Sequence, residues 1–154
     1  MPDIRYDTTP LDVDAFLALA QRVWPRDYDR ERAAAALACT TSVSAWDRDR
    51  LVGSVRVLSD GYLFAVVTEI LVDPDYQRTG IGRALMARAL DGAPRGRLFL
   101  GAQPQSVAFF ERLGYQRGPV GFVAARDSGV IPSGARELHL AEPTARADPS
   151  LRSG

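Results

Sequence analysis

The chain has 154 residues, 46% of them apolar and 25% charged, and its 19 basic and 19 acidic side chains cancel. This composition is typical of one soluble globular domain, and the balanced charge gives no electrostatic reason to expect nucleic acid or an anionic membrane as a partner. A single cysteine and a single histidine exclude an internal disulfide and a metal site built from those residues.

Two features indicate a cytoplasmic protein that does not bind membranes. The amino terminus has no apolar signal-peptide core, and no apolar run approaches the roughly 20 residues that a membrane-spanning helix needs. The lone Cys39 fits a reducing compartment.

The predicted elements begin with a strand at residues 4–7 and two helices. Thr9 offers a capping hydroxyl, Pro10 suits a first helical turn, and Asp12 lies three residues after the cap. These signals predict a helix that begins at Thr9 and covers a sheet with its apolar face. Residues 29–38 are rich in Ala, Arg and Glu and predict a second helix.

Three strands are predicted next, at residues 43–46, 51–58 and 62–72, because these runs are rich in β-branched and aromatic residues. Short polar turns at 47–50 and 59–61 separate them. Connections this short imply antiparallel neighbours.

A helix is predicted after the third strand, because apolar residues recur every fourth position from Ile81 until Gly92. A strand at 97–101 and a helix opened by Pro104 follow, and 120–125 and 137–140 are weaker strand candidates. We expect one domain over residues 1–140. Residues 141–154 carry too little apolar surface to offset the entropy of ordering them, which predicts a mobile tail.

The segment Gln-Arg-Thr-Gly-Ile-Gly at residues 77–82 lies between a predicted strand and a predicted helix. A helix that begins after Gly80 leaves unpaired N–H groups and a positive dipole end at this turn. Gly80 and Gly82 lack side chains that would keep a pyrophosphate from the backbone, and Arg78 and Arg83 can add charge-assisted bonds. The spacing fits neither the Walker loop nor the dinucleotide fingerprint.

The sequence resembles the GNAT acetyltransferase superfamily at two places. Gln77, Gly80 and Gly82 match its Gln/Arg-x-x-Gly-x-Gly/Ala signature, and residues 109–115, Phe-Phe-Glu-Arg-Leu-Gly-Tyr, are similar to its Phe-Tyr-Glu-Lys-Leu-Gly-Phe segment. The resemblance implies an α/β fold with a mixed, mainly antiparallel central sheet and helices on both faces. It also implies acetyl-CoA as cosubstrate and direct transfer of the acetyl group to an amine.

In the family, the backbone of the glycine turn binds the coenzyme pyrophosphate and the preceding strand pairs with the pantetheine arm. Residues at the start of the later helix also touch the arm, although Ser106 could equally cap that helix. The coenzyme-binding residues implied by this resemblance are Ile70, Leu71, Val72, Gln77, Arg78, Thr79, Gly80, Ile81, Gly82, Arg83, Gln105 and Ser106.

The resemblance implies Glu69 as the catalytic base, because family members often place a glutamate at the matching position. The alternative is that Glu69 pairs with an arginine or faces solvent. Many members use a tyrosine as general acid where this chain has Phe110. Water, Tyr115 or Tyr76 could replace it, or the domain could bind the coenzyme without efficient turnover.

These departures leave a non-catalytic acyl-CoA-binding or regulatory module as the alternative to an N-acetyltransferase. A generic nucleotide-binding domain would retain only the phosphate turn. The expected acceptor is a small-molecule amine or a protein amine, and a homodimer is compatible with the resemblance.

Overall fold

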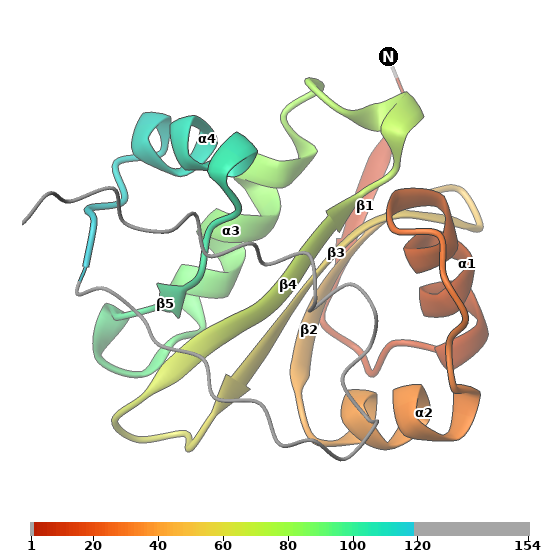
Figure 1. Ribbon diagram of the computed structural model, residues 1–154, viewed down its shortest axis with the longest axis horizontal. Coiled ribbons are helices and arrows are strands. Elements are labelled where there is room, and N and C mark those ends of the chain that lie inside the picture. Colours follow the sequence, from red (N-terminus) through yellow and green to blue (C-terminus); the bar gives the residue numbers. More distant parts are fainter. Residues whose placement is uncertain (1, 119–154) are drawn as a thin grey trace, which may run out of the picture. The chain divides into compact units, whose positions relative to one another are not determined.

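The computed structural model describes residues 2–118 (Figure 1). In chain order these form β1 (Ile4–Asp7), α1 (Val13–Val23), α2 (Arg30–Ala38), β2 (Thr41–Asp47), β3 (Arg50–Ser59), β4 (Ala65–Val72), α3 (Ile81–Asp91), β5 (Phe99–Leu100) and α4 (Val107–Arg112). The predicted strands at 120–125 and 137–140 and the predicted tail at 141–154 lie outside the described residues.

The strands form one sheet in the order β1-β2-β3-β4-β5. The first four are antiparallel to their neighbours, as the short connections predicted, and β5 is parallel to β4. Helices α1 and α2 cover one face of the sheet, and α3 covers the other (Figure 1). The predicted α/β architecture is therefore confirmed. Within residues 2–118, no helix is both long and apolar enough to cross a bilayer.

The first helix begins later than predicted. Asp12, not Thr9, is its N-cap, and the Asp12 carboxylate accepts hydrogen bonds from the N–H groups of Asp14 and Ala15. Thr and Asp both favour the N-cap position, so the sequence offers two candidate caps three residues apart.

The strand predicted from residue 62 begins only at Ala65. Asp60 explains the difference, because its Oδ1 accepts hydrogen bonds from the N–H groups of Tyr62, Leu63 and Phe64 at 2.8, 2.8 and 3.0 Å. This Asx-type turn overrides the β propensity of the three apolar residues. The strand predicted at 97–101 is likewise reduced to Phe99–Leu100.

Two apolar layers hold the helices on the sheet. The α1 layer contains Leu11, Phe16, Leu19, Ala20, Leu51 and Leu71. The α3 layer is larger and includes Val52, Val55, Val67, Ile81, Leu85, Met86 and Phe110. Helix α3 approaches the sheet closely at Gly53, where an added Cβ would lie 2.9 Å from Cγ2 of Ile81.

A β-bulge interrupts β4 in its middle. Arg56 of β3 pairs with Glu69, whereas the next residue, Val57, pairs with Val67. Thr68 is therefore an extra residue that no residue of β3 opposes.

The bulge changes which side chains of β4 face which helix. Regular alternation from the buried Val67 would send the side chains of residues 69 and 71 into the α3 layer. After Thr68, however, Ile70 and Val72 pack against the α3 layer, and Leu71 packs in the α1 layer. Glu69 therefore lies on the α1 face of the sheet.

Candidate functional site

The end of β4 presents an unusual strand edge. The Asp73 N–H donates to the Val52 carbonyl at 2.9 Å. Hydrogen-bonded and non-hydrogen-bonded pairs alternate in an antiparallel ladder, so the backbone groups of Leu71 also face β3. The N–H and C=O groups of Ile70 and Val72 therefore point to the opposite edge, on the side where β5 lies.

Among the described residues, β5 pairs with β4 only through Val66 and Val67. The ladder does not extend to Ile70 and Val72, so the edge of β4 is open there. One of its carbonyls has a local partner, because Nε2 of Gln77 donates to the Val72 oxygen at 3.2 Å. An extended ligand with amide groups could pair with this edge as a strand would.

The open edge leads directly into the glycine turn. Gly80 is the N-cap of α3 and has a φ of +92°, in the left-handed region that favours glycine. No side chain caps this helix, so the N–H groups of its first turn remain as donors. Arg78 and Arg83 are exposed beside the turn, and neither forms an ion pair within residues 2–118. The turn thus combines the features of an anion site.

Gly82 also lies close to α4. A Cβ added at Gly82 would lie 3.2 Å from Cζ of Phe109. The absence of a side chain therefore lets α4 approach α3, and this contact brings the start of α4 beside the start of α3. Gln105 and Ser106 precede α4 and are exposed and half-buried, respectively. Ser106 is the N-cap residue of α4, but its side chain makes no capping hydrogen bond.

The remaining predicted residues divide into backbone and core positions. Ile81 is 2% exposed, so only its backbone atoms could contact a ligand. Leu71 is 1% exposed, and its N–H and C=O groups face β3, away from the open edge. The Thr79 hydroxyl donates to the Tyr76 carbonyl at 2.5 Å and thereby tightens the turn.

Glu69 and Arg56 form an ion pair on the α1 face of the sheet. Arg56 donates from Nε to Oε1 and from Nη2 to Oε2 of Glu69. Both side chains are 12% exposed, and the Arg56 guanidinium also lies over the ring of Phe16. The structure thus has the arginine pairing that was the alternative reading of Glu69. Pairing alone does not remove the base role, because each carboxylate oxygen has a second lone pair.

The candidates for a general acid occupy different surroundings. Phe110 is buried in the α3 layer and contacts the rings of Phe109 and Tyr115. Burial raises the pKa of Tyr115, whose hydroxyl is enclosed without a partner among the described residues. The Tyr76 hydroxyl donates to Asp47 at 2.6 Å, and this hydrogen bond raises the pKa of Tyr76. The hydroxyl proton of Tyr76 is therefore used in the hydrogen bond to Asp47.

Sequence reasoning missed a charged cluster at the entry to the glycine turn. The side chain of Asp73 is fully buried. It accepts from Arg22 Nε at 2.7 Å, Arg22 Nη2 at 3.0 Å, Arg50 Nη2 at 2.6 Å and the Asp75 N–H at 3.0 Å. Burial raises the pKa of Asp73, but these bonds outweigh it and hold the pKa below its ordinary value.

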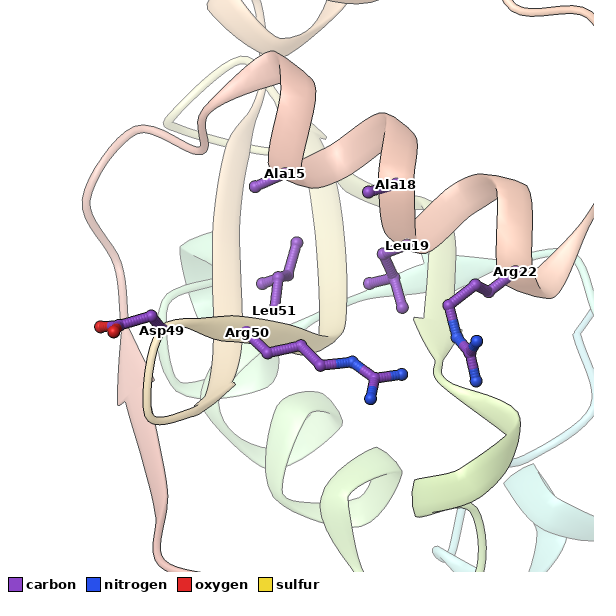
Figure 2. A pocket seen from close by; sticks show the side chains of 7 residues that line it. All are labelled: Ala15, Ala18, Leu19, Arg22, Asp49, Arg50 and Leu51. Atoms are coloured by element: carbon purple, nitrogen blue, oxygen red, sulfur yellow. The ribbon is translucent and has the colours of Figure 1, made fainter.

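Arg22 and Arg50 also border a cavity of about 320 Å³ between α1 and the β2–β3 turn (Figure 2). Figure 2 shows both guanidinium groups reaching into the same space below the helix. The cavity is lined by Ala15, Ala18, Leu19, Arg22, Asp49, Arg50 and Leu51.

A family model described as an acetyltransferase (GNAT) domain matches residues 10–127 of this chain. A Glycine max protein named as a probable acetyltransferase is 33% identical over 127 residues, which are 71% of this chain and 51% of that protein. The chloroplastic serotonin N-acetyltransferase 2 of Oryza sativa subsp. japonica is 35% identical over 127 residues, which are 75% of this chain and 62% of that protein. The chain thus spans less than two thirds of either relative.

Solved structures show the same fold. A GNAT-family acetyltransferase from Streptococcus pneumoniae has a TM-score of 0.70 and 26% identity, over 80% of this chain and 98% of that chain. An aminoglycoside N-acetyltransferase in complex with CoA has a TM-score of 0.62 and 14% identity, over 81% of this chain and 94% of that chain. The family model covers β2 to β5, the glycine turn and α4 together, and the chain belongs to the GNAT acetyltransferase family.

Proposed function

We propose that this protein transfers the acetyl group of acetyl-CoA directly to an amine. The observation that carries the proposal is the continuity of two features: the open edge of β4 at Ile70 and Val72 leads into the uncapped N-terminus of α3 at Gly80. One feature suits an amide-bearing arm, and the other suits a pyrophosphate. Coenzyme A contains both groups in that order.

The fit to the coenzyme rests on backbone groups. The outward N–H and C=O groups of Ile70 and Val72 can pair with amides of the pantetheine arm. The first-turn N–H groups of α3 and the exposed Arg78 and Arg83 can bind pyrophosphate oxygens. Gln105 and Ser106 lie on the side of the turn where α4 contacts α3, and can donate to the arm.

The proposed reaction is aminolysis of a thioester. The nitrogen of the neutral amine attacks the carbonyl carbon, the carbon–sulfur bond breaks, and coenzyme A leaves as a thiolate. The amine nitrogen loses one proton and the thiolate gains one. Glu69 accepts the proton of the amine, through water, on a lone pair that Arg56 does not use. Water supplies the proton to the thiolate, because Phe110 has none to give.

A non-catalytic coenzyme-binding module is the second candidate, and two observations favour it. Phe110 is buried where many family members have a tyrosine, and both oxygens of Glu69 are engaged by Arg56. Such a module would use the coenzyme site without transferring the acetyl group.

The test is thiol release from acetyl-CoA in the presence of a panel of amines: arylalkylamines, polyamines, aminoglycosides and peptides with free N-termini. Arylalkylamines are included because the rice relative is named for serotonin. Amine-dependent release is expected, and its substrate profile would assign a small-molecule or a protein amine as acceptor. Binding of coenzyme A without release across the panel would favour the module, and no binding would overturn both.

The matched variant for this test reverses two charges at the turn. Arg78→Glu/Arg83→Glu changes two exposed side chains that make no ion pair in residues 2–118, so the fold should persist. Coenzyme binding and thiol release should both fall in this variant.

A further inference from the structure

Asp73 is the junction of three elements. Arg22 reaches it from α1, Arg50 from the start of β3, and the N–H of Asp75 from the short 3-10 turn that follows β4. We propose that Arg22 and Arg50 are positioning residues, which hold Asp73 and thereby set the conformation of the coenzyme-binding turn. The inference rests on the proposed function of that turn.

The connection from Asp73 to the glycine turn is a chain of short-range hydrogen bonds. The Asp73 N–H donates to Val52, and its carbonyl accepts from the Tyr76 N–H at 2.8 Å. The Thr79 hydroxyl then donates to the Tyr76 carbonyl at 2.5 Å, one residue before Gly80. A shift of Asp73 would therefore be passed to the N-cap of α3.

The geometry of the cluster indicates that it orients Asp73 and does more than attach α1 to β4. Two well-packed apolar side chains would join α1 to β4 with less desolvation than a buried carboxylate. Four donors from three directions instead fix both oxygens of Asp73, and the Arg22 fork also fixes the plane of the carboxylate. A small displacement of groups that bind a ligand can cost far more in affinity or rate than in stability.

A second arginine–aspartate pair involving α1 offers a matched control. Arg30 donates to Asp14 of α1 from Nε at 2.9 Å and from Nη2 at 3.1 Å, so this pair repeats the Arg22–Asp73 fork. Both of its side chains are exposed, and it joins α1 to α2, away from the glycine turn. Loss of this fork should loosen α1 without moving the coenzyme site.

The experiment compares Arg22→Met, Arg50→Met and Arg30→Met in the full chain. For each variant, the Kd for coenzyme A is measured by calorimetry and folding by circular dichroism at the assay temperature. Arg22→Met should weaken coenzyme binding by about tenfold and Arg50→Met by less, because Arg22 makes two bonds to Asp73 and Arg50 makes one. Arg30→Met should stay within about twofold of the unchanged chain. In turnover assays the KM for acetyl-CoA should rise in Arg22→Met, and kcat should change little.

A double variant tests whether Arg22 acts through Asp73. Arg22→Met/Asp73→Asn should bind coenzyme A no more weakly than the weaker-binding of its two single variants, Arg22→Met and Asp73→Asn, because both changes break the same link. Arg22→Lys keeps the charge but loses the fork, so it decides the question if Arg22→Met does not fold.

Two results would overturn the inference: an unchanged Kd in a folded Arg22→Met or Arg22→Lys variant, or an equal loss in Arg30→Met. Additive losses in the double variant would also contradict it. Failure of the unchanged chain to bind coenzyme A would overturn the proposed function first, and this inference with it.

Discussion

Glu69 and Arg56 face one another on adjacent strands, and Arg56 engages both oxygens of the Glu69 carboxylate, with Nη2 2.7 Å from Oε2. The pair lies one residue after the bulge at Thr68, on the face covered by α1. The residue proposed as the base is therefore held in one orientation by a partner on the neighbouring strand.

Glu69→Gln should lower kcat by about 10² or more, because general-base catalysis contributes about 10²–10⁴. The Kd for coenzyme A should stay within about threefold, since the side chain of Glu69 faces α1 and not the open edge of β4. Steady-state kinetics and calorimetry on the same preparation check both. Arg56→Met is the control, because it breaks the same ion pair and keeps the carboxylate. An equal loss of kcat in the two variants would indicate that the pair is structural.

Gly80→Ala should destabilise the fold by about 1 kcal/mol, because alanine is strained at a φ of +92° even though nothing lies within 4 Å of the added Cβ. Gly80→Asn should lose less, since asparagine tolerates the left-handed region better. Urea unfolding measures the difference. Gly101→Ala is the matched control: its Cβ also meets nothing within 4 Å, and its φ lies outside the left-handed region. Equal effects at the two glycines would contradict the conformational explanation.

Asp73 should make stability depend on pH in the acid range. Its pKa in the folded chain lies below the ordinary value of 3.8, so its contribution is fully present above that value and is lost as pH falls through the folded pKa. The difference in unfolding free energy between the unchanged chain and Asp73→Asn should therefore be constant from neutral pH to about 5 and shrink below about 4. Urea titrations between pH 7 and pH 3 test this. A difference that stays constant to pH 3 would show that Asp73 does not titrate in this way.

The helix cap at Asp12 gives a direct test of the boundary of α1. Asp12→Ala should cost about 1 kcal/mol, because the N–H groups of Asp14 and Ala15 lose their acceptor. Thr9→Ala should have little effect, since Thr9 precedes the cap. Thermal or urea unfolding of the two variants compares them, and a larger loss for Thr9→Ala would restore the boundary predicted from the sequence.

The features that the sequence predicted well are local in the chain. The glycine turn and its helix need only the identities of residues 77–82 and the apolar repeat that follows, so both their place and their order could be predicted. The antiparallel pairing of β2, β3 and β4 followed from short turns. The predicted start of the third strand at Tyr62 was wrong, because the Asp60 carboxylate accepts hydrogen bonds from three successive N–H groups and holds these residues in a turn.

The features that it did not predict depend on residues far apart in the chain. Arg22 and Arg50 lie 51 and 23 residues from Asp73, and nothing in the local sequence marks them as its partners. The outward direction of the Ile70 and Val72 backbone depends on the register with β3, which the bulge at Thr68 alters. The composition of a segment can predict a strand, but it does not say which residues of the neighbouring strand will pair with it.

The extra residue in β4 also bears on how this protein can vary. Thr68 is exposed, so many side chains could replace it without disturbing either apolar layer. Its deletion would place Glu69 directly after Val67, and the regular alternation of a strand would keep Glu69 on the α1 face and Ile70 on the α3 face, with the same partners on β3. At this position, natural variants should therefore differ freely in the identity of the residue, and chains that lack it should keep both apolar layers.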